Sequence, residues 1–449
     1  MQIPDEALAI LTEGVPLLGE PRFDSPLKER GSGPDGASQY QDEEERVLAS
    51  PFLSDWKENN RSKTAPPSFE LAGPRPKLFF DPKKTRAAIV TCGGLCPGLN
   101  DVIRRVTMTF TLNYGLRQVY GIRYGYRGLV EGEAEAPLLL RPEDIEPISN
   151  DGGTYLGSSR GDRNPVDMVD FLQRREIQIL IAVGGDGTQK GALAIANEAD
   201  KRGYPLSVVG LPKTIDNDIG LVEKTFGFDT AVAIATEVLK GAHVEAEAEE
   251  DGVVIVKLMG RQSGFLAANA SVASGDVNYV LIPEVEFDLE GPKGLLACLH
   301  QRLKNRKHAL IAVAEGVAER LVASADEKER LDASGNALFD DVGVYLKSRI
   351  SNYFKEMGFP ARIRYLDPSY YVRSLPANPT DSIFCQNLAH NAVHAAMSGR
   401  TRMLVATCHG VYCHIPMEAV VLGRQFVDPE GPLWRSVLET TGQPARMVN

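Results

Sequence analysis

The sequence predicts an α/β protein built on doubly wound parallel sheets, and two patterns support this fold class. First, short apolar runs alternate along the chain with segments of helical periodicity. These runs cover residues 87–91, 177–183, 206–211, 253–257, 279–282 and 308–314. Second, each run is continuously apolar, which is typical of parallel strands buried on both faces of a sheet. Ligands bind such sheets at the carboxyl ends of the strands, so the residues that follow each run are candidates for function.

The length of the chain and the composition of its first part indicate how it is organised. A chain of 449 residues favours two or three domains. Residues 1–80 contain an acidic run at 42–45, a proline-rich stretch at 65–67 and no sustained periodicity. We expect them to form an N-terminal extension with at most one short helix, which wraps on the body of the protein or is partly disordered.

Charge and hydropathy argue against several classes of partner. Lys and Arg total 49 and Asp and Glu total 60, so the formal net charge of −11 disfavours a nucleic-acid binder. No apolar run approaches the roughly 18 residues of a membrane span, and the first residues lack the pattern of a signal peptide. Six cysteines in a chain of this length are not a disulfide framework. We therefore expect a cytoplasmic protein with no nucleic-acid and no membrane partner.

A glycine-containing loop follows the first predicted strand. It contains Gly93, Gly94 and Gly98 and leads into a predicted helix. The helix carries one apolar stripe, formed by Leu99, Val102, Ile103, Val106 and Phe110. Glycines between a strand and a helix let the backbone approach an anion, and the helix N-terminus offers free N–H groups to it. A phosphate loop ending in Gly-Lys-Ser/Thr and a Gly-x-Gly-x-x-Gly after a strand are both missing, which disfavours P-loop enzymes and nicotinamide dehydrogenases.

A second loop, Gly184–Thr188, places Asp186 among three glycines at the start of another helix. A carboxylate in this position can hold a hard cation, while the backbone and the Thr188 hydroxyl hold phosphate oxygens. The alternative is an ordinary helix cap, which would not need the surrounding glycines.

Two further sets of residues complete the predicted chemistry. Asp216 and Asp218 follow the third strand, and in an extended segment both carboxylates would point the same way, which suits a general base. A solvated turn is the alternative. Arginine side chains are the second set, because their planar guanidinium groups suit phosphate. Any one of these arginines, taken alone, can instead be an ordinary surface residue. The arginines next to loop signals are Arg160, Arg261, Arg364 and Arg373.

Taken together, these motifs resemble the 6-phosphofructokinases. The similarity covers about residues 80–425 and is greatest to the long-chain ATP-dependent branch of plants and trypanosomatids, which is related to pyrophosphate-dependent enzymes. The matching segments are Gly93-Gly94-x-x-Pro97-Gly98-x-Asn100, Gly152-Gly153-Thr154-x-Leu156-Gly157-Ser158-x-Arg160, Gly184–Thr188, Pro212–Asp218, Met259–Arg261, Ile282-Pro283-Glu284, Glu315-Gly316 and Tyr370-Tyr371-Val372-Arg373.

The resemblance implies an activity, which is ATP-dependent phosphorylation of fructose 6-phosphate at its 1-hydroxyl. The products would be fructose 1,6-bisphosphate and ADP, as in the committed step of glycolysis. Asp216 corresponds to the general base, Thr214 and Asp218 to groups that orient the reactants, and Arg160 to a cation on the γ-phosphoryl group. Asp186 corresponds to the ligand of Mg²⁺. The nucleotide-phosphate residues would be Gly93, Gly94, Arg160, Gly161, Gly185, Asp186, Gly187, Thr188 and Lys190.

The resemblance also implies how the sugar phosphate is bound and how the chain is divided. The residues expected to bind fructose 6-phosphate are Thr214, Ile215, Asp216, Met259, Gly260, Arg261 and Glu315, with Tyr370, Arg373 and Arg364 on its 6-phosphate. Two Rossmann-like lobes of the phosphofructokinase fold would follow the extension. A nucleotide-binding lobe would span 81–227, completed by about 374–400, and a sugar-phosphate lobe 228–373, completed by about 401–449. Because some family members take phosphate-binding arginines from a neighbouring subunit, a homo-oligomer, either a dimer or a tetramer, is implied.

Two positions bear on the phosphoryl donor and point in different directions. Gly187 is the small residue of ATP users in this family, where pyrophosphate users carry an Asp. Lys213 is the residue of pyrophosphate users, although the plant and trypanosomatid ATP enzymes combine it with the glycine. We expect ATP, because a steric and electrostatic block is a stronger filter than an added cation. A pyrophosphate-dependent enzyme is the alternative. A non-catalytic regulatory subunit is a second one, disfavoured because Asp186 and Asp216 are both present.

Overall fold

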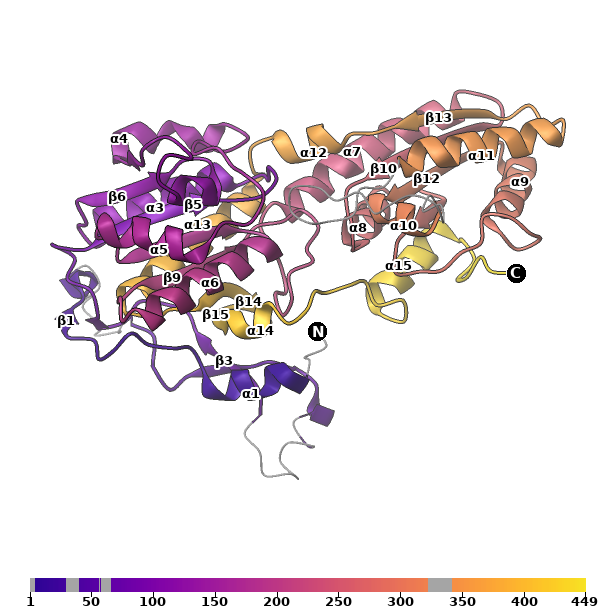
Figure 1. Ribbon diagram of the computed structural model, residues 1–449. Helices are drawn as coiled ribbons and strands as arrows, with labels where there is room; N and C mark the ends of the chain where they lie inside the picture. The colour runs from indigo at the N-terminus through magenta and orange to yellow at the C-terminus, as the bar shows by residue number, and fades with distance from the viewer. Residues whose placement is uncertain (1–4, 30–39, 56, 58–65, 322–340) are drawn as a thin grey trace. The chain divides into compact units, whose positions relative to one another are not determined.

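A computed structural model describes residues 5–29, 40–55, 57, 66–321 and 341–449 (Figure 1). The chain divides into two compact units and crosses between them five times. Unit 1 comprises Met1–Thr214, Ile219–Gly227 and Ser374–Gln425, and unit 2 comprises Ile215–Asp218, Phe228–Arg373 and Phe426–Asn449. The part of the predicted extension at 30–39 and 58–65 lies outside the described residues.

Among the described residues, unit 1 contains a nine-stranded sheet in the order β2-β3-β15-β14-β9-β8-β5-β6-β7. Its strands are β2 (Arg46–Leu48), β3 (Ser68–Leu71), β5 (Arg86–Thr91), β6 (Gln118–Ile122), β7 (Leu138–Leu139), β8 (Ile179–Gly184), β9 (Ser207–Pro212), β14 (Met403–Cys408) and β15 (Val411–Pro416). The central strands β14, β9, β8, β5 and β6 run parallel. Strands β15 and β7 pair antiparallel with the two ends of this group, and β3 and β2 continue beyond β15 with antiparallel pairing. Outside this sheet, β1 (Phe23–Asp24) pairs with β4 (Lys77–Leu78).

One expected boundary is therefore wrong. We expected residues 401–449 to complete the second lobe, but residues 401–425 belong to unit 1. The reason is strand pairing, because β14 adds in parallel to β9 and β15 then folds back on β14. Only residues 426–449 join unit 2.

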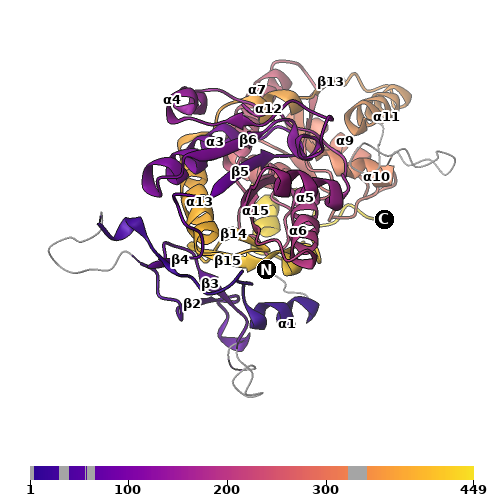
Figure 2. The same cartoon turned by 60° about the vertical axis from the view of Figure 1, so that its left-hand side comes forward.

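Helices cover both faces of the central strands of unit 1 (Figure 2). Helices α5 (Pro165–Arg174) and α6 (Asp186–Lys201) pack their apolar side chains against alternate strand residues such as Ala88, Val90 and Ala182. Helices α3 (Leu99–Met108) and α13 (Pro379–Met397) cover the opposite face. Every residue of the predicted apolar stripe is buried, and its last member, Phe110, lies in the π-helical turn that follows α3. The other helical segments are α1 (Asp5–Glu13), α4 (Pro142–Ile145), α14 (Met417–Val420), the short 3-10 turns Pro26–Glu29, Gly125–Leu129 and Pro147–Asn150, and a π-helical turn at Thr109–Asn113.

The described part of the N-terminal extension is built into unit 1. Strands β2 and β3 lengthen the sheet beyond β15, and Ala7, Leu11 and Phe69 pack in one apolar cluster with residues of β14 and β15. Beside this cluster lies a buried ion network. It consists of Glu70 with Arg75, Arg400, His414 and the more exposed Glu43.

Unit 2 is built on a parallel sheet in the order β11-β12-β10-β13. Its strands are β10 (Gly252–Leu258), β11 (Tyr279–Leu281), β12 (His308–Ala314) and β13 (Arg362–Leu366). Its helices are α7 (Phe228–Glu247), α8 (Phe265–Ser274), α9 (Leu295–Arg306), α10 (Ala318–Leu321), α11 (Val342–Glu356), α12 (Ser369–Ser374) and α15 (Pro432–Thr441), with a 3-10 turn at Glu315–Val317.

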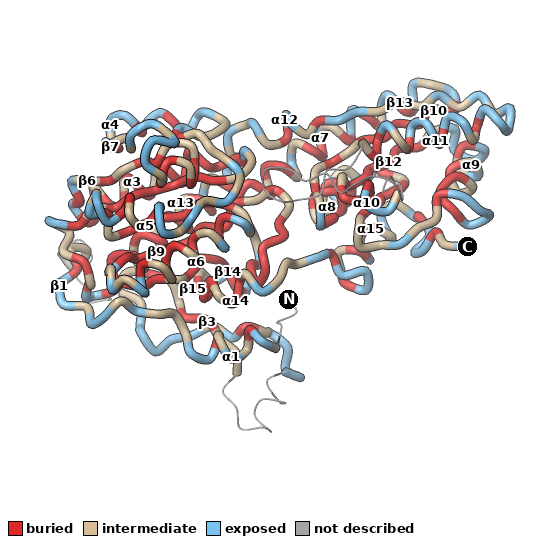
Figure 3. Tube along the Cα trace, in the orientation of Figure 1, coloured by how far each residue is buried: buried red, intermediate tan, exposed pale blue. Residues whose placement is uncertain are grey.

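Apolar packing again fixes the two faces of the unit 2 sheet. Val253, Ile255 and Ile311 face α9 and α11 and form one buried cluster with them. Helices α7 and α8 pack together, and α7 contacts β10 and β12. Figure 3 shows that β10 and β12 are mostly buried, with only Lys257 and His308 partly exposed, whereas β13 at the sheet edge alternates between exposed and partly buried residues. The two inner strands of this sheet, β10 and β12, thus correspond to continuous apolar runs, and the apolar run at 279–282 forms β11 at the other edge.

The predicted α/β fold class is confirmed. The predicted apolar runs correspond to β5, β8, β9, β10, β11 and β12, with ends that differ by no more than two residues. Among the described residues, no helix combines the length and apolar character needed to span a membrane.

Candidate active site

The loop after β5 is held by a second loop, 151–160, in unit 1. The backbone N–H of Gly93 donates to the carbonyl of Ser159 (3.0 Å), and Ser158 Oγ donates to the carbonyl of Gly93 (2.5 Å). Asn100 makes two further hydrogen bonds to the 151–160 loop, to the carbonyl of Asp151 and from the N–H of Tyr155. Gly93 has φ +86, a left-handed conformation that favours glycine. These contacts bring the residues around Gly93 and the segment that leads to exposed Arg160 into one region.

Lys213 joins the ends of three strands. Its backbone N–H donates to the carbonyl of Gly184 at the end of β8, and its Nζ donates to the carbonyl of Gly94 at 2.7 Å. The side chain is buried, and a Cβ placed on Gly93 would lie 3.4 Å from Nζ. The ammonium group therefore lies at the Gly93–Gly94 loop, where a side chain on Gly93 would crowd it.

The Gly184–Thr188 loop is held by hydrogen bonds from the side chain of Gln189. The buried side-chain amide of Gln189 donates to the carbonyls of Gly184 and Leu211. A Cβ on Gly184 would lie 2.1 Å from Thr188 Oγ1, so glycine is required there. Gly187 is different, because it is exposed and a Cβ on it would meet no atom within 4 Å. The loop is therefore closely packed at Gly184, whereas the space around Gly187 is open.

Asp186 is the first residue of α6, where the helix N-terminus favours negative charge. Its side chain is 9% exposed and forms two ion pairs, with Lys190 Nζ at 3.0 Å and with Arg424 Nη2 at 3.0 Å. Lys190 was predicted at this site and Arg424 was not. The only sequence signal for Arg424 is a Gly-Arg pair, Gly423-Arg424, similar to Gly260-Arg261.

The segment after β9 bends between its two carboxylates. Asn217 has φ +53, a left-handed conformation, so Asp216 and Asp218 do not lie in the extended segment that we expected. The carbonyl of Thr214 accepts from Thr225 Oγ1 (2.7 Å), and the carbonyl of Asp216 accepts from Ser263 Oγ (2.9 Å). Thr214 belongs to unit 1 and Ile215–Asp218 to unit 2, so this segment carries the chain from one unit to the other.

The predicted sugar residues of unit 2 meet at the carboxyl ends of β10 and β12. These strands are parallel neighbours with Leu258 opposite Ala314, which places Met259–Arg261 beside Glu315. The N–H of Gly316 donates to the carbonyl of Gly260 (3.0 Å), and a Cβ on Gly316 would lie 2.0 Å from the carbonyl oxygen of Arg261. The pairing of β10 with β12 thus brings Arg261 and Glu315 to the same end of the sheet.

Glu284 supports the start of α8 near this edge. Its Oε1 accepts from the N–H of Gly264 (2.8 Å) and from the N–H of Val427 (2.9 Å). Burial raises the pKa of Glu284 above its usual value, despite these hydrogen bonds. The sequence indicated Glu284 as part of a motif but gave no reason for its role.

The residues expected to bind the 6-phosphate fall into two groups. On α12, the guanidinium carbon of Arg373 lies 5.1 Å from the ring centroid of Tyr370, which is 78% exposed. Arg364 is in β13, where it forms ion pairs with Glu245 (3.0 Å) and Glu249 near the end of α7. The acidic partners give Arg364 a different environment from Arg373.

Residues 86–396 match the family described as Phosphofructokinase. An ATP-dependent 6-phosphofructokinase of Borreliella burgdorferi is 44% identical over 439 residues, which cover 96% of this chain and 97% of that protein. A chloroplastic ATP-dependent 6-phosphofructokinase of Arabidopsis thaliana is 44% identical over 374 residues, 83% of this chain and 68% of that protein. The structure of a pyrophosphate-dependent phosphofructokinase from Marinobacter aquaeolei superposes with a TM-score of 0.65 at 21% identity, covering 80% of this chain and 91% of that one, and so shows a shared fold.

Proposed function

Because this chain belongs to the phosphofructokinase family, we propose that it is an ATP-dependent 6-phosphofructokinase that phosphorylates the 1-hydroxyl of fructose 6-phosphate. The observation that carries the proposal is the set of strand ends in unit 1. There Lys213, the Gly93–Gly94 loop and the Gly184–Thr188 loop are joined by hydrogen bonds. Backbone N–H groups, a helix N-terminus and nearby cations are the features that bind a polyphosphate.

ATP rather than pyrophosphate is the donor that we assign. Gly187 leaves open space at the start of α6, into which a nucleotide would extend beyond the phosphates that it shares with pyrophosphate. Lys213 supports the alternative donor, because its buried ammonium group lies beside the Gly93–Gly94 loop. Measuring turnover with each donor, fructose 6-phosphate and Mg²⁺ separates the two. Turnover with pyrophosphate but not with ATP would contradict our assignment.

Asp186 is suited to hold Mg²⁺ together with the nucleotide. In proteins this ion is usually bound by one or two carboxylates plus substrate phosphates, and Asp186 offers one carboxylate at a helix N-terminus. Its ion pairs with Lys190 and Arg424 show that the carboxylate already attracts positive charge. Bound Mg²⁺ would neutralise negative charge on the transferring phosphoryl group. Arg160, Lys190 and Arg424 would contribute positive charge from this chain.

We assign proton removal to Asp216. Its carboxylate takes the proton of the 1-hydroxyl as the sugar oxygen bonds to the γ-phosphorus, and the bond from that phosphorus to the β-phosphate oxygen of ADP breaks. The hydrogen bonds from Ser263 to Asp216 and from Thr225 to Thr214 position the backbone that carries the base. Thr214, Asp218 and the backbone of Ile215 complete this segment in our assignment.

The sugar phosphate is assigned to unit 2. The residues at the carboxyl ends of β10 and β12 would bind the sugar, and these are Met259, Gly260, Arg261 and Glu315. On α12, Tyr370 and Arg373 would bind its 6-phosphate. Arg364 would join them only by leaving Glu245 and Glu249. An exposed aromatic pair on α12, Tyr370 and Tyr371, supports a homo-oligomer, which sedimentation can test as a dimer or a tetramer.

The cysteines support a reducing compartment, and we propose the cytoplasm. All six are in the described residues and all six are free thiols. Disulfides form and persist in oxidising environments, so a chain with several cysteines and no disulfide among them fits a reduced one.

A further inference from the structure

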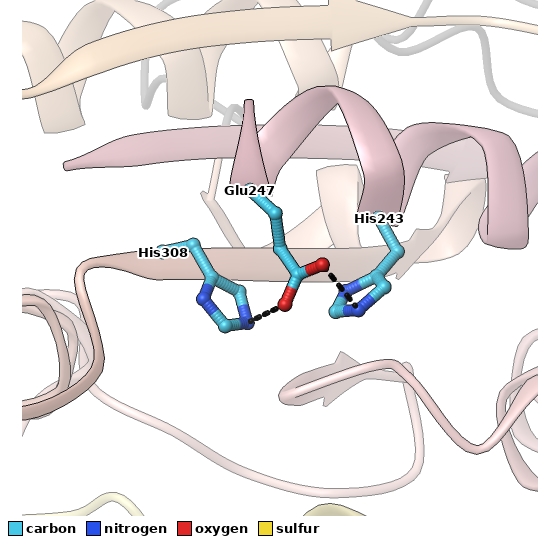
Figure 4. Close-up of side chains that lie close together, drawn as sticks. All are labelled: His243, Glu247 and His308. Carbon is cyan, nitrogen blue, oxygen red and sulfur yellow. Dashed lines mark ion pairs between the residues drawn. The ribbon is translucent and has the colours of Figure 1, made fainter. Parts of the chain in front are cut away.

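Three side chains that the proposed reaction does not use lie together in unit 2 (Figure 4). His243 and Glu247 are one turn apart on α7, and His308 is the first residue of β12. His243 Nε2 lies 3.5 Å from Glu247 Oε2, and His308 Nε2 lies 3.9 Å from Glu247 Oε1. One ligand atom from each residue can be chosen so that all three lie within 4.8 Å of one another. They are at the amino end of β12, whereas Glu315 follows its carboxyl end.

The contacts of His308 define which of its nitrogens faces the carboxylate. His308 Nδ1 lies 3.1 Å from the carbonyl oxygen of Arg306, and because a carbonyl only accepts, Nδ1 carries the proton. In the neutral ring, Nε2 then directs a lone pair towards Glu247. A lone pair facing a carboxylate is unfavourable unless a cation lies between them.

Glu247 also differs from the acidic residues that follow it. Glu249 pairs with Arg362 and Arg364, and Asp251 pairs with Lys307. In the described part of the chain, the ion pairs of Glu247 are with the two imidazoles. Glu247 is the last residue of α7, where the helix dipole favours a cation.

We propose that His243, Glu247 and His308 bind one divalent transition-metal ion of the Zn²⁺ class. Two imidazoles and one carboxylate are a ligand set typical of Zn²⁺, and a fourth position would remain for water. An ion about 2.0–2.1 Å from each ligand requires ligand atoms roughly 3.3 Å apart. The three ligand atoms lie within 4.8 Å of one another, so binding would draw them together by at most about 1.5 Å. Glu247 is 53% exposed, which gives the ion a path from solvent.

This site is distinct in chemistry from the Mg²⁺ position at Asp186. Mg²⁺ prefers oxygen ligands and keeps several waters, whereas imidazole nitrogen suits Zn²⁺. The bound ion would connect the end of α7 to the start of β12, which are 61 residues apart between Glu247 and His308. We therefore expect it to stabilise unit 2 rather than to take part in phosphoryl transfer.

The test is a Zn²⁺ titration of the full chain after treatment with a chelator. A chromogenic competitor reports binding, and millimolar Mg²⁺ and the absence of nucleotide keep carboxylate sites from contributing. We expect one equivalent of Zn²⁺ to bind at micromolar concentration or tighter and to raise Tm. His243→Gln, His308→Gln and Glu247→Gln should each weaken binding at least about 100-fold, since loss of a supporting residue alone costs about 10–100-fold.

Matched controls are available on the same chain. Glu237→Gln changes another exposed glutamate of α7, and His409→Gln changes an exposed histidine of unit 1. Both should bind Zn²⁺ as the unaltered chain does, and all five variants should keep kinase activity, which confirms folding. No Zn²⁺ binding, or equal binding in the three site variants, would overturn the proposal. With Co²⁺ as a second probe, a thiolate charge-transfer band would assign the ion to a cysteine and would also overturn it.

Discussion

The carboxylate of Asp186 and the guanidinium group of Arg424 lie 3.0 Å apart, although 238 residues separate them in the sequence. Both belong to unit 1, where β14 and β15 bring the end of the unit back beside α6. Arg424 is therefore placed to neutralise Asp186 and to act on the same polyphosphate.

Replacing Arg424 with alanine tests this role. We expect Arg424→Ala to raise the KM for MgATP about 10-fold or more, because a hydrogen bond to a charged group contributes about 1.5–3 kcal/mol. The KM for fructose 6-phosphate should stay within about twofold, and Arg424→Lys should restore part of the loss. Steady-state kinetics in each substrate measures both effects. An unchanged KM for MgATP, as expected for the exposed control Arg435→Ala, would remove Arg424 from the site.

The choice of donor can be tested at Gly187. Its φ is not in the left-handed region and a Cβ meets no atom within 4 Å, so substitutions there do not disturb the fold. We expect Gly187→Asp to lower kcat/KM for ATP about 100-fold or more, because a new carboxylate near phosphate is strongly repelled. Gly187→Ala is the matched control and should have little effect. Equal activity of the two variants with ATP would show that this position does not select the donor.

If Asp216 is the general base, replacing it should abolish turnover but not the binding of fructose 6-phosphate. Asp216→Ala should remove nearly all turnover, a loss of about 10²–10⁴-fold, because proton removal loses its acceptor. Binding of fructose 6-phosphate, measured by calorimetry, should be largely retained. Asp167→Ala, at an exposed position in the first turn of α5, controls for the loss of a carboxylate elsewhere. Turnover near that of the unaltered chain would rule out Asp216 as the base.

The buried ion network predicts a pH-dependent contribution to stability. Burial alone would raise the pKa of Glu70, but His414 and Arg400 lower it well below its usual range. A carboxylate with a lowered folded-state pKa stabilises the protein fully above its unfolded value of about 4.3, and this contribution is lost as pH falls through the folded-state value. We expect Glu70→Gln to cost about 3–5 kcal/mol at pH 7, because it leaves buried Arg75 and Arg400 with only the more exposed Glu43 as a carboxylate partner in the network.

Urea denaturation of Glu70→Gln at several pH values checks this expectation. The difference from the unaltered chain should be largest at pH 6–7 and should shrink below about pH 4. Glu176→Gln, which removes an exposed partner of Arg86, should cost no more than about 1 kcal/mol at any pH. A difference that is independent of pH would show that Glu70 contributes through packing rather than charge.

Local patterns in the sequence predicted the elements that are buried on both faces. Strands β5, β8, β9, β10 and β12 are continuous apolar runs, and the glycines after them mark the loops that the structure joins at Lys213. Strand β13 was not predicted, because Arg362 and Arg364 alternate with apolar residues at the exposed edge of its sheet. Such a strand is defined by its neighbour β10 rather than by its own residues.

Long-range pairing explains the remaining differences. The membership of β14 in unit 1 depends on its contact with β9, where Met403 lies opposite Val209, and nothing in either strand alone specifies that pair. Arg424 was missed for the same reason, since its partner is distant in the sequence. The left-handed turn at Asn217 was missed because an Asx-containing segment fits both extended and bent conformations.

The five crossings of the chain have a consequence for how the protein is made. During synthesis the four strands of the described unit 2 sheet are complete once Leu366 has left the ribosome. The sheet of unit 1 begins earlier but waits for β14 and β15, which end at Pro416. Until then the side of β9 that will pair with β14 is an open sheet edge, which can pair with strands of other chains. The first unit to begin emerging is thus the last to complete its sheet, and a nascent chain that stalls between residues 366 and 403 would expose the edge of β9.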